Sequence, residues 1–170
     1  MSKFIWGVKN TVSKDPAVKE RLSHLSDITF NYVSDKPIEG HYSCFKIFVG
    51  RKYYIAKTKS IQWTLQNLNK ILKAYNSNGT DGKDLYFPLV KHIHNTGYYD
   101  VQIEFICQSE NPYEVIKAEF LALQENVGKS LCLNKNKEPY TPKYNPDTQM
   151  HGWLTVNQYL NYKKLVKNNI

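Results

Sequence analysis

The sequence predicts a small α/β domain, with a three-stranded antiparallel sheet flanked by helices. Three observations support this fold class. Apolar residues alternate along two neighbouring segments and along a third further on. Apolar residues recur at helical spacing between and after these segments. The chain has 170 residues with 41% apolar content, which is enough for one core. We expect an N-terminal arm at 1–40, the domain at 41–134, and an extended tail ending in a helix at 135–170.

The first forty residues have the pattern of an arm rather than of a core. Asp15-Pro16 is a favourable helix start, because aspartate caps a helix and proline fits its first turn. A short apolar stripe follows at Val18, Leu22 and Leu25. We expect irregular or extended structure at 27–40, which ends in turn residues.

The domain is expected to open with a β-hairpin. Residues 41–49 alternate, so that Ser43, Phe45, Ile47 and Val49 share one face and Tyr42, Cys44, Lys46 and Phe48 share the other. Gly50-Arg51 is predicted to be a tight turn. Residues 52–56 then return as the partner strand.

Two helices and a loop are predicted next. Apolar residues at helical spacing predict four turns, with the stripe Ile61, Leu65, Leu68, Leu72 and Tyr75. Residues 76–84 are rich in Asn, Gly and Asp, which predicts a loop. The next segment predicts a short helix that stops near Gly97 and carries Leu85, Leu89 and Ile93 on one side.

A third strand and a further helix complete the predicted domain. Residues 99–106 alternate again, with an apolar face formed by Val101, Ile103 and Phe105. Asn111-Pro112 followed by Glu114 predicts a capping box with proline at the first helical position. That helix is expected to turn Ile116, Phe120, Leu123 and Val127 inward and to close at Gly128.

The tail contains a long connection and a final helix. About twenty residues, 134–153, include three prolines, and a connection of that length is usually functional or wraps a partner. The final helix should start near Thr155 with Gln158 in the capping-box position. Its predicted apolar face is Val156, Tyr159, Leu160 and Val166.

Positive charge is concentrated in one part of the chain. The net charge is +8, and residues 41–100 hold nine basic and three acidic side chains. Such a block suits nucleic acid or an acidic protein surface, while the alternative is a solvated lysine face. Trp63 lies off the apolar stripe and could stack a base or, as we prefer, anchor a protein partner. The candidate contacts are Lys46, Arg51, Lys52, Lys57, Lys59 and Trp63.

Other classes of site find little support. No apolar run is long enough for a membrane helix, and the N-terminal residues lack the centre of a signal peptide. Three cysteines lie far apart without a CxxC pair, which favours reduced core thiols. His92 and His94 are two residues apart on a predicted helix, which makes a poor metal pair.

The order of these elements, with the residues on them, resembles the GIY-YIG endonuclease domain over about Tyr42–Asn134. The segment Ser43-Cys44-Phe45-Lys46-Ile47 resembles the first signature, and Tyr54-Ile55-Ala56 resembles the second. Glu119 falls where the family has its metal-binding glutamate, and Leu133-Asn134 resembles the Leu-Asn that often ends the domain.

The resemblance also implies that the catalytic set is incomplete. Tyr54 matches one of the two family tyrosines, but Phe45 takes the place of the other and has no hydroxyl. Thr64 stands at the place of the family arginine, and Leu68 stands where a histidine or tyrosine is common. Losing a charge stabiliser alone costs about 10²–10³ in rate. Tyr54 and Glu119 are therefore expected to be inactive remnants. The structural alternative for Glu119 is a helix carboxylate paired with a lysine.

The sequence therefore favours a non-catalytic binding or assembly protein on a degenerate nuclease fold, without a cofactor. An Asn-, Lys- and Tyr-rich composition suits a phage protein, and a general likeness points to portal-vertex auxiliary proteins of crAss-like phages. This predicts a virion component, assembled in the host cytoplasm into a symmetric oligomer. Its partners would be capsid and portal proteins, with DNA as a further candidate. The alternative is an active Mg²⁺-dependent endonuclease using Tyr54, Glu119 and lysines such as Lys57 or Lys59, with Mg²⁺ on Glu119.

Overall fold

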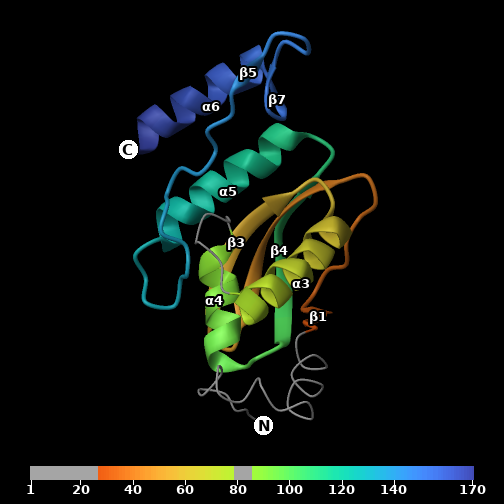
Figure 1. The fold of residues 1–170 in the computed structure, drawn as a ribbon. Helices are drawn as coiled ribbons and strands as arrows, with labels where there is room; N and C mark the ends of the chain where they lie inside the picture. The colour runs from red at the N-terminus through yellow and green to blue at the C-terminus, as the bar shows by residue number, and fades with distance from the viewer. Residues whose placement is uncertain (1–26, 79–85) are drawn as a thin grey trace.

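The computed structural model describes residues 27–78 and 86–170, and it confirms a mixed α/β fold (Figure 1). The expected arm helix at Asp15-Pro16 lies outside the described residues, as do positions 79–85. The elements in chain order are β1 Thr29–Tyr32, β2 Tyr42–Val49, β3 Lys52–Thr58, α3 Ile61–Asn78, α4 Phe87–Thr96, β4 Asp100–Ser109, α5 Pro112–Asn126, β5 Tyr144–Asn145, β6 Met150–His151, β7 Leu154–Thr155 and α6 Val156–Asn169. In this part of the chain no helix has the length and apolar character needed to cross a bilayer.

The main sheet has four strands in the order β1-β4-β2-β3. Strand β2 is antiparallel to both β3 and β4, as the sequence predicts for the three-stranded sheet. The sequence did not predict β1, which pairs in parallel with β4. Its four residues are too short to show an alternation, and the pairing partner lies about seventy positions away, so local pattern carries little signal. The extended segment at 27–40 thus contributes an edge strand.

The hairpin between β2 and β3 turns at Gly50, whose φ of +63° is readily adopted by glycine. The predicted two faces of β2 are confirmed, because Phe45, Ile47 and Val49 enter one core cluster while Cys44 enters another. A bulge in the pairing with β4 falls between Cys44 and Phe45.

Helices cover both faces of the sheet. Helices α3 and α4 pack on the face of Phe45 and Ile47, with Leu68, Leu72 and Leu89 fully buried there. Helix α4 ends at Gly97, which has a left-handed backbone and donates its N–H to the carbonyl of Ile93. Helix α5 packs on the opposite face; its Val115 and Leu123 lie against Cys44, Tyr53 and Ile55. All three cysteines are free, with Cys44 and Cys132 buried and Cys107 half-buried.

The end of helix α5 differs slightly from the prediction. The side chain of Asn111 caps its start by accepting from the N–H of Tyr113, as expected for this position. The N–H of Asn111 donates to Ser109 Oγ at 3.0 Å and not to Glu114, so only one half of the predicted capping box forms. The helix ends at Asn126, two residues before Gly128, which has a φ of +100°.

The chain after α5 returns to the outer edge of β3. Tyr53 donates its N–H to the carbonyl of Leu131 at 2.9 Å, and Leu133 donates to the carbonyl of Tyr53 at 2.8 Å. The buried amide of Asn134 then accepts from the N–H of Ile55 at 2.7 Å and donates to its carbonyl at 2.9 Å. The side-chain amide of Asn134 therefore makes the two hydrogen bonds with the Ile55 backbone that a neighbouring strand would otherwise make.

Replacing Asn134 with alanine should destabilise the domain, because it leaves the Ile55 N–H and carbonyl buried without these partners. An unsatisfied buried polar group costs about 1–3 kcal/mol, so we expect the free energy of unfolding to fall by about 2 kcal/mol or more in urea titrations. Asn161→Ala, on the exposed side of α6, is the matched control and should change stability by less than about 0.5 kcal/mol. Equal midpoints for the two variants would contradict the role given to Asn134.

The tail folds back onto α5 instead of staying extended. Strands β5, β6 and β7 form a small antiparallel sheet, and their two-residue lengths gave no alternation to detect. Helix α6 begins with the predicted capping box of Thr155 and Gln158. It packs on α5 through Tyr162, whose ring centroid is 5.8 Å from that of Phe120.

The predicted apolar face of α6 is partly wrong. Tyr162 and Val166 are buried, but Val156 and Leu160 are 40% and 53% exposed. The ring of Tyr162 also meets Tyr140, at 5.5 Å between centroids. A large ring buries more apolar area than valine or leucine, and this favours the rotation of the helix that places Tyr162 inward.

Candidate binding site at the start of helix α3

The connection from β3 to α3 is held by three hydroxyl groups. Thr58 Oγ1 donates to the carbonyl of Ser60 at 2.9 Å and accepts from the Ser60 N–H and from Thr64 Oγ1. Ser60 Oγ accepts from the N–H of Trp63, which caps the first turn. Thr64 is buried and donates its hydroxyl to Thr58 Oγ1, so its side chain stabilises the turn. It carries no charge that could bind a phosphate, as the family arginine does at this position.

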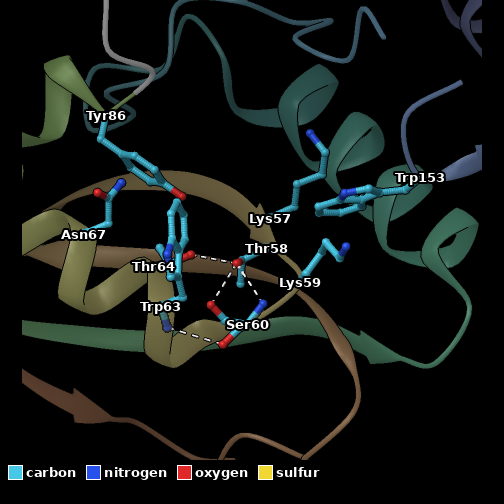
Figure 2. A pocket seen from close by; sticks show the side chains of 9 residues that line it. All are labelled: Lys57, Thr58, Lys59, Ser60, Trp63, Thr64, Asn67, Tyr86 and Trp153. Atoms are coloured by element: carbon cyan, nitrogen blue, oxygen red, sulfur yellow. Dashed lines mark hydrogen bonds between the residues drawn. The ribbon is translucent and has the colours of Figure 1, made fainter. Parts of the chain in front are cut away.

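A pocket of about 580 Å³ lies beside this turn (Figure 2). Trp63 and Tyr86 stand on one side of it and Trp153 stands across from them, while Thr58 and Ser60 lie between the two sides. The Trp63 side chain is 63% exposed, as its position off the apolar stripe predicts. The full lining is Lys57, Thr58, Lys59, Ser60, Trp63, Thr64, Asn67, Tyr86 and Trp153.

The Lys57 ammonium is held by Glu119 and two aromatic rings. Its Nζ is 2.8 Å from Glu119 Oε1, and both side chains are largely buried. The same Nζ lies 5.2 Å from the centroid of Tyr140 and 5.9 Å from that of Trp153, within cation–π range. Burial raises the pKa of Glu119, while the charge and hydrogen bond of Lys57 oppose that rise. Lys57 and Glu119 therefore neutralise each other beneath the tail.

Tyr54 and Glu119 do not form a common site. Tyr54 packs in the core under α3 and α4, with its ring 5.7 Å from that of Tyr86. Glu119 lies on α5, which covers the other face, and meets Lys57 there. Phe45 and Leu68, at two further positions of the resemblance, are fully buried core residues.

The six predicted partner contacts fall into two groups. Lys57, Lys59 and Trp63 line the pocket. The others lie toward the hairpin turn: Lys46 Nζ is 4.8 Å from the Tyr53 ring centroid, and Arg51 and Lys52 are exposed at the turn. A strand rises about 3.3 Å per residue, which puts Lys52 roughly 20 Å from Thr58. The structure thus divides the predicted basic surface.

The sequence did not predict that the tail contributes to this site. Tyr140 Oη donates to the carbonyl of His151 at 2.6 Å and accepts from the N–H of Trp153 at 3.1 Å. These bonds fix Trp153 beside Lys57 and against Tyr42, at 5.1 Å between ring centroids. No local pattern indicates contacts between positions about ninety residues apart.

A metal centre is not evident in the described part of the chain. Within residues 27–78 and 86–170, no three His, Cys, Asp or Glu side chains gather in a way that could hold a metal ion. His94 hydrogen-bonds Asn76, and burial lowers the pKa of His92. Glu119 is the Mg²⁺ ligand only of the alternative, active endonuclease, and its carboxylate accepts a hydrogen bond from Lys57.

Comparison of the chain with protein families, with curated proteins and with solved structures gives no match. The interpretation of the site therefore depends on its own geometry and chemistry.

Proposed function

We propose that the protein is a non-catalytic binding module, built on a degenerate nuclease-like frame, that acts in the assembly of a phage particle close to its DNA. The observation that carries the non-catalytic part is the buried pair of Lys57 and Glu119. A Mg²⁺-dependent hydrolase needs a carboxylate oxygen open to the metal and a nucleophile organised beside it. Here Glu119 is 5% exposed and bonded to Lys57, and Tyr54 packs under α3 and α4.

The binding part of the proposal is supported by the pocket at the start of α3. Exposed aromatic surface beside a cavity and an accessible lysine are common in sites that a partner covers. The assignment to a phage is based on the Asn-, Lys- and Tyr-rich composition and on the general likeness of the sequence to portal-vertex auxiliary proteins of crAss-like phages. Mass spectrometry of particles purified from the encoding phage should detect the chain, and its absence would contradict the structural role.

A plasmid-nicking assay separates this proposal from an active endonuclease. With Mg²⁺ or Mn²⁺, we expect the full chain to cut no faster than a metal-free control. Glu119→Gln and Glu125→Gln make a matched pair, because both lie on α5 but only Glu119 is buried. Cleavage that is lost in Glu119→Gln and kept in Glu125→Gln would establish the endonuclease instead.

A further inference from the structure

We propose that the pocket at the start of α3 binds an unpaired base of single-stranded nucleic acid, which stacks on Trp63 with its phosphate beside Lys59. This rests on the proposed binding function and names its ligand class. Trp63 and Trp153 face the pocket from different sides, and their elements are separated by about ninety residues of chain (Figure 2). The fold therefore brings two indoles to one cavity.

The shape and lining of the pocket suit a flat, largely apolar ring. A volume of about 580 Å³ lies within the range of small-molecule sites and can hold a nucleoside. Trp63 is 63% exposed although its ring is apolar, so a stacked ligand would remove that surface from water. Stacking on an aromatic side chain is a recurring mode of single-strand binding and tolerates every base.

The charges around the pocket suit a phosphate. Among residues 27–78 and 86–170 no carboxylate lines it, and Glu119 behind it is neutralised by Lys57. Lys59 is exposed at the rim. Helix α3 starts here without an acidic residue in its first turn, so the partial positive charge of its start is not offset there. A purely apolar partner side chain would use the indoles but not these positive groups, whereas a nucleotide would use both.

The same features predict a preference for single strands without strong sequence selectivity. A base in a duplex is stacked and paired, so it cannot lie on Trp63 until it is extruded. Lysine contacts to phosphate position a strand but do not read the bases. The site would therefore hold DNA or RNA wherever bases are already unpaired.

The test is fluorescence anisotropy with a labelled twelve-nucleotide oligo-dT and a labelled blunt-ended duplex of twelve base pairs. The full chain is used in EDTA so that metal-dependent cleavage cannot interfere. We expect the oligo-dT to bind more tightly than the duplex. Trp63→Ala should weaken binding about tenfold or more, since one base loses its stacking partner. Lys59→Ala should reduce the slope of log affinity against log salt by about 0.7.

Tyr98→Ala is the matched control, because Tyr98 is also an exposed aromatic, at 57%, but its ring lies beside Gly50 at the hairpin turn. It should bind within about twofold of the wild type. Both aromatic variants replace exposed side chains, and equal urea midpoints will verify that they fold. The proposal is overturned if Trp63→Ala binds like the wild type, if the duplex binds as tightly as oligo-dT, or if oligo-dT does not bind at low salt. The last outcome would assign the pocket to a partner protein and leave the non-catalytic proposal standing.

Discussion

Replacing Lys57 with methionine is expected to lower the free energy of unfolding by about 3–5 kcal/mol at neutral pH, because the buried Glu119 loses its counter-charge. The wild-type pair places Lys57 Nζ 2.8 Å from Glu119 Oε1, so methionine removes both the charge and the hydrogen bond. Chemical denaturation of both proteins measures the loss. Lys164→Met, on the exposed side of α6, should change stability by less than about 0.5 kcal/mol.

The loss in Lys57→Met should depend on pH in a defined direction. Burial already raises the pKa of Glu119 above its unfolded value, and removing Lys57 removes the groups that oppose this rise. The folded variant then binds a proton at pH values where the unfolded chain does not, so its stability falls as pH rises through the folded pKa. The difference from wild type should be smallest below the unfolded pKa and largest at neutral pH. A constant difference across that range would contradict the assignment.

The double variant Lys57→Met/Glu119→Leu tests whether the pair itself stabilises the fold. Replacing a complete buried ion pair with apolar residues is often neutral or stabilising. We therefore expect the double variant to recover most of the stability that Lys57→Met loses. A double variant as unstable as Lys57→Met would mean that the Lys57 contacts with Tyr140 and Trp153, and not the charge of Glu119, dominate.

The Gly152→Ala variant should lose about 2–4 kcal/mol and detach Trp153 from the pocket. Gly152 has a φ of +59°, and a Cβ there would lie 2.8 Å from Tyr140 Oη and 3.0 Å from Pro142 Cβ. Tyr140 would have to move, and with it the hydrogen bonds that fix His151 and Trp153. Urea titration will measure the loss of stability. Emission in a Trp6→Phe/Trp63→Phe background, where Trp153 is the remaining tryptophan, will measure its detachment.

Gly97→Ala is the control for Gly152→Ala, because Gly97 has a similar φ of +72° and nothing within 4 Å of its added Cβ. It should show only the backbone strain, about 1–2 kcal/mol. If the two variants lose equal stability, the close approach of the added Cβ at position 152 to Tyr140 does not contribute to the loss.

Local pattern was sufficient for most of the fold. Alternation in residues 42–49 and helical spacing from Ile61 gave the central elements, because their side chains face one core on each side of the sheet. It did not predict β1 or β5 to β7, because strands of two to four residues are too short to show the alternation of apolar and polar side chains. For α6 the pattern located the helix and its cap but not the rotation that buries Tyr162, which depends on Phe120 and Tyr140.

The site was predictable only in part, for a related reason. Lys57, Lys59 and Trp63 follow one another along the chain, so their neighbourhood could be inferred from the strand and helix they join. Trp153 reaches them through contacts that span about ninety residues. For Glu119 the sequence leaves two roles open, a metal ligand or the partner of a lysine, and the structure pairs it with Lys57 from a distant strand.

The return of residues 131–134 along β3 has a consequence for how partners can attach. An open edge strand offers a row of amides and carbonyls to which another chain can add a strand. At β3 the groups of Tyr53 and Ile55 are already paired with the chain's own backbone and with the amide of Asn134. This protects β3 against edge-to-edge aggregation and prevents strand addition there. A partner that bound along Tyr53 and Ile55 would therefore be recognised by side chains and not by backbone pairing.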